Sequence, residues 1–168
     1  ENHRNSIEQK NRYLEDAYKV IEGYISKITD SIRYAERIQS AILPPLTISE
    51  KFFRDNYAFY KPKDFVSGDF YWLTVKDDTL FVAVADCTGH GVPGAFMSII
   101  GIDLLSQAVN QKNIIEPASI LDFLNIELRN KLRKEESEEL ILKDSMDVAV
   151  VSLKLGDNKI RYSGALIP

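Results

Sequence analysis

The sequence predicts an α+β fold, in which a long N-terminal helix precedes a mostly antiparallel sheet and a pair of helices. Three observations favour this class. Residues 4–43 carry a seven-residue apolar repeat, two strand patterns are separated by a short polar turn, and two helical patterns come before the last strand patterns. This order differs from the strict alternation of strands and helices that builds a parallel α/β sheet.

Length and composition restrict the functional classes. The 168 residues suit one domain with an appendage, and the net charge of −4 gives no general attraction to nucleic acid or to an anionic membrane. The single cysteine, Cys87, excludes an intrachain disulfide and is compatible with a reducing compartment, so we expect a cytoplasmic location. No apolar run approaches the roughly 20 residues of a membrane span, and no signal peptide is visible. Because the first residue is Glu1, we expect a piece of a longer protein, which leaves room for an upstream sensor or membrane region.

Residues 1–43 are expected to form a coiled-coil linker helix. Apolar residues recur at a spacing of seven, at Ile7, Leu14, Ile21, Ile28, Ala35 and Ile42. A helix of about eleven turns cannot bury such a stripe against itself, so we expect a homodimer formed through this helix. The alternative is a long helix packed on its own domain. Pro44 and Pro45 end the helix, and residues 44–168 form the second unit.

The second unit combines strand and helix patterns. We expect strands at residues 57–60, 66–75, 79–85, 146–153 and 159–163, with the second and third forming an antiparallel hairpin through Asp77 and Asp78. We expect helices at residues 94–109 and 117–133, the latter burying Ile120, Leu121, Leu124, Ile126 and Leu128. The charged stretch 131–139 is expected to be a solvated loop or helix end.

Two aspartates stand beside the predicted hairpin. Asp86 directly follows six apolar residues, and a carboxylate at the end of a buried strand needs a partner or a cation. If the hairpin aligns it with Asp69, the two carboxylates repel each other, and a hard divalent cation such as Mg²⁺ or Mn²⁺ resolves that repulsion. The alternative is that each aspartate caps a turn or a helix. Cys87 lacks the partners of a zinc site, and an isolated histidine such as His90 is more often structural than a ligand.

Three motifs carry a family resemblance. The segments SGDFYW, VAVADCTGHGVPGAFMSIIG and KDSMDVAV resemble the SpoIIE-type branch of the metal-dependent PPM (protein phosphatase 2C-like) serine/threonine phosphatases. The resemblance covers about residues 44–168, and residues 34–44 look like the linker that often precedes this domain.

The resemblance implies a two-sheet antiparallel β sandwich flanked by helices, with two Mn²⁺ or Mg²⁺ ions at one end of the sheets. By that similarity the metal ligands are Asp69, Asp86 as the bridging carboxylate, and the backbone carbonyl of Cys87. The loop that contains Gly89 and Gly91 would shape the site, and Asp147 would lie near it, in a family-like segment with Asp144. His90 is a candidate for phosphate contact or for protonation of the leaving group.

The resemblance also sets expectations for function. It implies a bacterial signalling phosphatase that hydrolyses phosphoserine or phosphothreonine on a partner protein, such as an anti-sigma-factor antagonist, under control of the N-terminal helix. The family takes further metal ligands from strands beyond the point where this sequence ends. We therefore expect a C-terminally truncated domain with an incomplete sheet, weak metal binding and little or no activity. The alternatives are a coiled-coil interaction module with a degenerate, non-catalytic domain, and a small-molecule phosphohydrolase.

Overall fold

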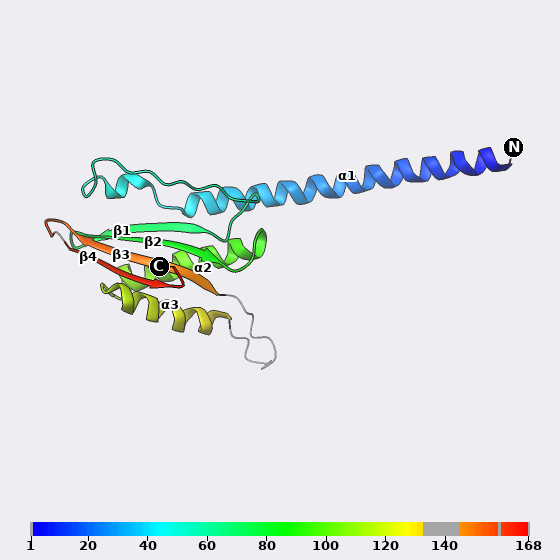
Figure 1. Cartoon of the computed structure of the whole chain (residues 1–168). Coiled ribbons are helices and arrows are strands. Elements are labelled where there is room, and N and C mark those ends of the chain that lie inside the picture. Colours follow the sequence, from blue (N-terminus) through cyan, green and yellow to red (C-terminus); the bar gives the residue numbers. More distant parts are fainter. Residues whose placement is uncertain (1, 133–144, 158, 168) are drawn as a thin grey trace.

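The computed structural model describes residues 2–132, 145–157 and 159–167, and it contains one long helix attached to an α+β domain (Figure 1). In chain order the elements are α1 (Asn2–Ile42), the 3₁₀ turn η1 (Leu46–Ser49), β1 (Phe70–Lys76), β2 (Thr79–Cys87), α2 (Val92–Ser106), the π-helical turn η2 (Gln107–Gln111), α3 (Pro117–Leu132), β3 (Met146–Lys154) and β4 (Ile160–Ala165).

The strands form one sheet of order β1-β2-β3-β4, in which every neighbouring pair is antiparallel. The predicted hairpin is confirmed. Asp77 and Asp78 both have positive φ angles, 48° and 57°, as a two-residue type I′ turn requires. The α+β class, the antiparallel sheet and the flanking helices are therefore confirmed, and the described residues contain a single sheet of the expected sandwich.

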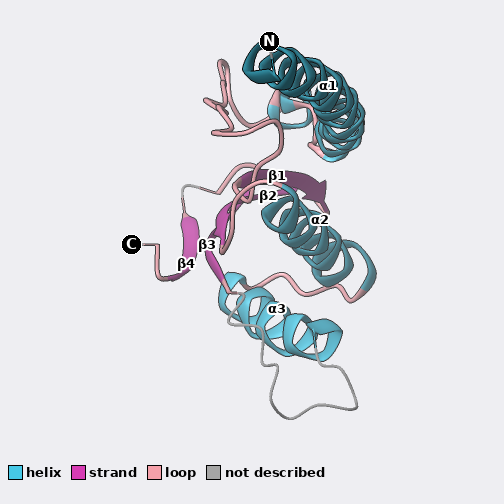
Figure 2. Ribbon diagram, turned by 90° about the vertical axis from the view of Figure 1, so that its right-hand side faces the viewer, coloured by secondary structure: helices cyan, strands magenta, loops and turns pink. Residues whose placement is uncertain are grey.

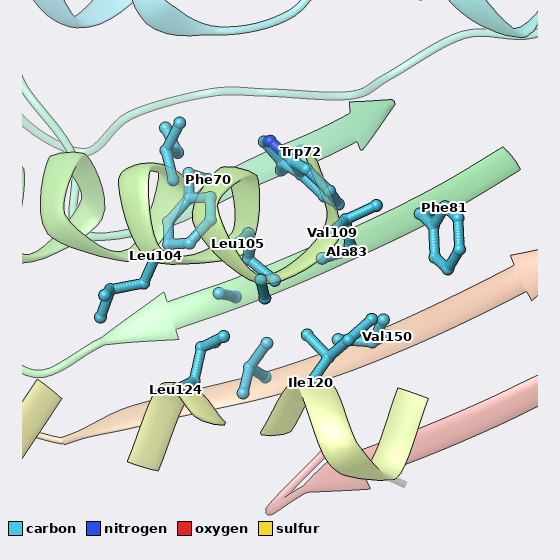
Figure 3. Close-up of a cluster of buried hydrophobic side chains, with 14 of the residues drawn as sticks. Phe70, Trp72, Phe81, Ala83, Leu104, Leu105, Val109, Ile120, Leu124 and Val150 are labelled. Carbon is cyan, nitrogen blue, oxygen red and sulfur yellow. The ribbon is translucent and has the colours of Figure 1, made fainter. Parts of the chain in front are cut away.

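The core lies between one face of this sheet and the helices α2 and α3, which Figure 2 shows on the same side of the strands. The labelled side chains of Figure 3 come from β1, β2 and β3, from both helices and from η2. Helix α2 packs closely on β1 and β3 at Gly101. A Cβ atom there would lie 2.5 Å from the Met146 methyl and 2.7 Å from the Phe70 ring, so a larger residue would force these side chains to shift.

The segment Val92–Gln111 corrects one expectation. It is long and apolar enough to cross a membrane by length and composition alone. Leu104, Leu105, Ala108 and Val109 are, however, buried in the core between the sheet and α3. Packing accounts for the hydropathy of this segment, because a helix covered by a sheet and a neighbouring helix is apolar on most of its surface.

The long helix α1 contacts the domain only near its C-terminal end, and the rest extends away as a rod (Figure 1). Ile42 and Leu43 pack against the core, and the Arg33 guanidinium lies 5.9 Å from the centre of the Phe65 ring. The apolar stripe remains open to solvent along the rod, with Ile21 51% and Ile28 60% exposed. The alternative of a helix packed along its own domain is therefore wrong for most of its length.

Several local predictions are also wrong. Residues 57–60 form no strand, because they have no ladder partner and Tyr57 and Phe59 are exposed. Tyr60 instead packs edge-on against Tyr71 of β1, with ring centres 6.1 Å apart. Strand β1 begins at Phe70 and not at residue 66. Helix α2 begins at Val92 and not at residue 94, and it continues into η2. Ile126 of α3, which was expected to be buried, is exposed. Most of the stretch 131–139, and Asp144, lie outside the described residues.

Candidate metal centre

Three aspartates lie in one row across the end of the sheet. Phe70 pairs with Ala85, so Asp69 lies one residue before the ladder and opposite Asp86, which itself pairs with Asp147. Directly opposite residues project from the same face of an antiparallel sheet. Ala85 and Cys87 are buried toward the helices, so Asp86 projects from the opposite face.

Asp69 and Asp86 interact directly. Burial raises the pKa of Asp69, and the hydrogen bond and the negative charge of Asp86 raise it further. Two carboxyl groups in this relation are best accommodated by a shared proton or a shared cation. Among the described residues, no group of three or more His, Cys, Asp or Glu side chains is close enough to hold a metal ion together. The structure thus brings Asp69 and Asp86 together. Asp147 is the ladder partner of Asp86 without completing a three-ligand group, and His90 bonds to Asp64 instead.

The backbone before Asp69 is packed tightly against the loop that follows β2. A Cβ atom at Gly68 would lie 2.8 Å from the Cys87 carbonyl oxygen and 2.9 Å from that of Gly89. The amide of Asp69 donates a hydrogen bond to the Ser67 hydroxyl, at 3.0 Å. The Cys87 carbonyl, a predicted ligand, therefore lies beside the residue that precedes Asp69.

The glycine-rich loop has the geometry that its sequence predicts. Gly89 and Gly91 have φ angles of 93° and 64°, in the region that favours glycine, and α2 starts immediately afterwards. A Cβ atom at Gly94 would lie 2.5 Å from the Gly89 carbonyl oxygen and 3.1 Å from the Gly68 backbone. The start of α2 and the Ser67–Asp69 segment thus form one compact unit.

His90 has a partner that sequence reasoning did not find. Its Nδ1 lies 3.2 Å from Oδ2 of Asp64, and its side chain is 80% exposed. Gln39 and the Ser67 hydroxyl were also missed, although both are buried and both bond to the backbone before or at Asp69. The available signal was a glutamine beside the apolar stripe, at the heptad position where the two preceding repeats carry Ile25 and Ile32.

Comparisons with known proteins show the family of the chain. A family model described as "Stage II sporulation protein E (SpoIIE)" matches residues 76–167, more than half of the chain. The chain belongs to the SpoIIE family. Its domain is therefore of the PPM phosphatase type.

A solved structure gives the same answer for the fold. The chain is similar to the SiaA-PP2C domain of Pseudomonas aeruginosa, with 31% sequence identity and a TM-score of 0.71. The match covers 83% of this chain and 54% of that chain, so this chain spans about half the length of the domain it matches. A search of curated proteins found no match.

Proposed function

We propose that this chain belongs to a bacterial signalling phosphatase that hydrolyses phosphoserine or phosphothreonine on a partner protein. The observation that carries the proposal is the carboxyl pair Asp69–Asp86 at the end of the hairpin, beside a glycine-rich loop at the start of a helix. Family membership and the similarity to a PP2C domain support the reaction class.

The donor set suits Mn²⁺ or Mg²⁺. Carboxylates and carbonyls are the ligands that hard cations prefer. The pKa of Asp69 is raised first by burial and then by Asp86, and a bound cation would offset both effects. We assign Asp69 and Asp86 as ligands, and the Cys87 carbonyl as a further one. Bound cations would supply the positive charge that neutralises a phosphoryl group and activates water.

The other residues hold and shape this site. Gly89 and Gly91 let the backbone turn between Asp86 and α2 without a side chain in the way. His90, held by Asp64 at the mouth of the loop, is placed by this proposal to contact phosphate or to protonate the leaving group. Asp147 lies next to Asp86 in the ladder and would adjust the charge of the site.

The test is Mn²⁺-dependent hydrolysis of a phosphoprotein or phosphopeptide by the full-length protein. We expect Asp69→Asn and Asp86→Asn each to lower kcat/KM by about 100-fold or more, because loss of a direct ligand exceeds the 10–100-fold effect of outer partners. Asp78→Asn, in the hairpin turn, is the matched control and should keep full activity. Activity that survives either ligand substitution would remove the metal assignment.

The 168-residue chain itself is proposed to bind Mn²⁺ weakly and to turn over little or no phosphopeptide. The reason is the finding that its described residues bring only two carboxyls into contact. Clear Mn²⁺-dependent turnover by this chain would contradict the proposal. If the full-length protein is also inactive and metal-free, the alternative of a non-catalytic interaction module is favoured.

We propose further that residues 1–43 act as a coiled-coil linker that forms a homodimer, and that residues 44–168 are the phosphatase-type unit. The exposed stripe of α1 supports the dimer, because an uncovered apolar seam is stable only against a partner. A cytoplasmic location and a protein substrate such as an anti-sigma-factor antagonist complete the proposal. Fractionation and a substrate screen with the full-length protein test these two points.

A further inference from the structure

Tyr60 carries a buried hydroxyl group that forms no hydrogen bond with any of the described residues. The Ser152 hydroxyl, on β3, is in the same state. A buried donor without a partner lowers stability, and phenylalanine would fill the place of the Tyr60 ring without that loss. Packing alone therefore does not account for a tyrosine at this position.

The Tyr60 ring lies beside Asp69. It packs edge-on against Tyr71, with ring centres 6.1 Å apart and an angle of 80° between the ring planes. Asp69 and Tyr71 are two residues apart along the chain, so their side chains project from the same face and are roughly 7 Å apart. Asp69, Tyr60 and Tyr71 also line one cavity, between the segment before β1 and the sheet. The unpaired hydroxyl is thus on the face of the sheet that carries Asp69 and Asp86.

The negative charge of Asp69 acts on the Tyr60 hydroxyl. Burial raises the pKa of Tyr60, the nearby Ser67 side chain lowers it, and the charges of Asp69 and Tyr71 raise it further. The Ser67 hydroxyl does not satisfy Tyr60, because the two side chains form no hydrogen bond, and it accepts the Asp69 amide hydrogen at 3.0 Å instead. The Tyr60 donor is therefore available close to a carboxyl group, which has two acceptor oxygens.

We propose that Tyr60 is a positioning residue of the metal centre, whose hydroxyl donates to the Asp69 carboxylate when that group serves as a metal ligand. This inference rests on the proposed function. A donor to a ligating carboxylate fixes its orientation, and burial of the hydroxyl keeps water from competing for the same oxygen. In the metal-free chain the Asp69 carboxyl bonds to Asp86 instead, which leaves the Tyr60 hydroxyl without a partner.

The stability of the metal-free chain gives the first test. Tyr60→Phe removes the hydroxyl and keeps the ring against Tyr71. In EDTA we expect the 168-residue chain with Tyr60→Phe to unfold at a higher urea concentration than wild type, because a buried donor without a partner is lost. Tyr57→Phe removes an exposed hydroxyl from the same segment and should leave the midpoint unchanged. A lower midpoint for Tyr60→Phe, or failure to fold, would show that the hydroxyl has a structural partner and would overturn the inference.

Mn²⁺ binding by the full-length protein gives the second test. Titration monitored by electron paramagnetic resonance should show Tyr60→Phe weakening Mn²⁺ binding by about tenfold, the lower end of the effect of an outer partner. Ser152→Ala removes the other buried unpaired hydroxyl, at the opposite end of β3 from Asp147, and should keep the wild-type affinity. The inference therefore requires opposite signs, with higher stability in EDTA and weaker Mn²⁺ binding. Unaltered Mn²⁺ affinity in Tyr60→Phe would overturn it.

The wild-type titration separates failure of this inference from failure of the proposed function. If wild-type protein binds no Mn²⁺, the metal assignment of Asp69 and Asp86 is wrong, and the positioning by Tyr60 falls with it. If wild-type protein binds Mn²⁺ and Asp69→Asn abolishes the binding while Tyr60→Phe does not weaken it, the proposed function stands and the inference alone is overturned.

Discussion

The carboxyl groups of Asp69 and Asp86 lower the stability of the metal-free chain, whereas in the proposed function the same two groups bind the cation. In the metal-free chain the two groups are unfavourable neighbours, and the pKa of Asp69 is raised, first by burial and then by Asp86. A carboxyl whose pKa is raised in the folded state adds stability that is fully present below its ordinary value of 3.8 and is lost as the pH rises through the raised value.

Asp86→Asn should therefore stabilise the metal-free chain at neutral pH. We expect the free energy of unfolding in EDTA to rise by about 0.2–1 kcal/mol, the range for like charges facing each other across strands. The loss of stability as the pH rises above the ordinary value of 3.8 should be smaller than in wild type. Urea denaturation at several pH values measures both effects, and Asp78→Asn is the matched control. A lower free energy of unfolding for Asp86→Asn than for wild type at pH 7 would show that the Asp69 carboxyl does not repel Asp86.

The Cys87 thiol should react only slowly with alkylating reagents in the folded chain. Burial, followed by the charges of Asp86 and Asp69, raises the pKa of the Cys87 thiol to about 12. At pH 8 the thiolate fraction is then lower by about a thousandfold than for an ordinary cysteine. We expect iodoacetamide to label the urea-unfolded chain rapidly and the metal-free native chain at least about a hundredfold more slowly. Equal labelling rates of the native and the unfolded chain would mean that strand β2 separates from its neighbours and exposes the Cys87 thiol.

The sequence allowed Asp69 and Asp86 to be predicted as neighbours because strand parity and a two-residue turn fix which residues face each other. The hydrogen bonds of Gln39 could not be predicted, because their partners are a backbone peptide and a serine on elements far along the chain. His90 was recognised as a residue of interest without its partner, since Asp64 lies in a loop whose path no periodicity determines.

At the scale of elements, α1 is the helix with the least packing against the rest of the molecule. It extends away from the domain and leaves its apolar stripe uncovered, as Figure 1 shows for the rod and the exposure values for Ile21 and Ile28. The heptad predicted the helix and its end within one residue, because a seven-residue repeat followed by Pro44-Pro45 is a strong local signal.

Charged substitutions in this stripe should separate the proposed dimer. Ile21→Asp together with Ile28→Asp would place two carboxylates in the seam, where desolvation of a charge is costly. We expect light scattering to report a monomer for the double variant and a dimer for wild type. Lys19→Asp with Ser26→Asp places charges on the opposite helix face and should leave the dimer intact. An unchanged mass for the seam variant would contradict the coiled coil.

Other elements show where local patterns fail. The residues YAFY at 57–60 have strand propensity, yet they lie beside the sheet without a ladder partner, because a strand exists only where a neighbour can pair with it. The end of α2 was placed at residue 109, whereas the helix continues through the π-helical turn to Gln111. There the Lys76 ammonium bonds to the carbonyls of Val109 and Asn110, a contact that only the folded hairpin provides.

At the scale of the whole molecule, the two faces of the sheet differ. One face is covered by α2 and α3, and the other lies under the segment that joins α1 to β1 (Figures 1 and 2). Between that segment and the sheet is a cavity of about 590 Å³, lined mainly by apolar side chains that include Phe53, Tyr71, Leu73, Val82 and Val84. Asp69 also lines the cavity, so one of the metal-ligand candidates lies beside an apolar hollow.

This hollow should bind an apolar dye such as anilinonaphthalene sulfonate in the native 168-residue chain. Val84, 47% exposed and part of the lining, is the residue to change, and Val84→Lys should lower the dye fluorescence by placing a charge in the hollow. Val75→Lys is the matched control, because Val75 projects from the same face of the sheet as Val84 but does not line the cavity. Both substitutions are at exposed positions, so the free energy of unfolding should change by no more than about 0.5 kcal/mol. Equal fluorescence of the two variants would show that the dye binds elsewhere, with the uncovered stripe of α1 as the first place to look.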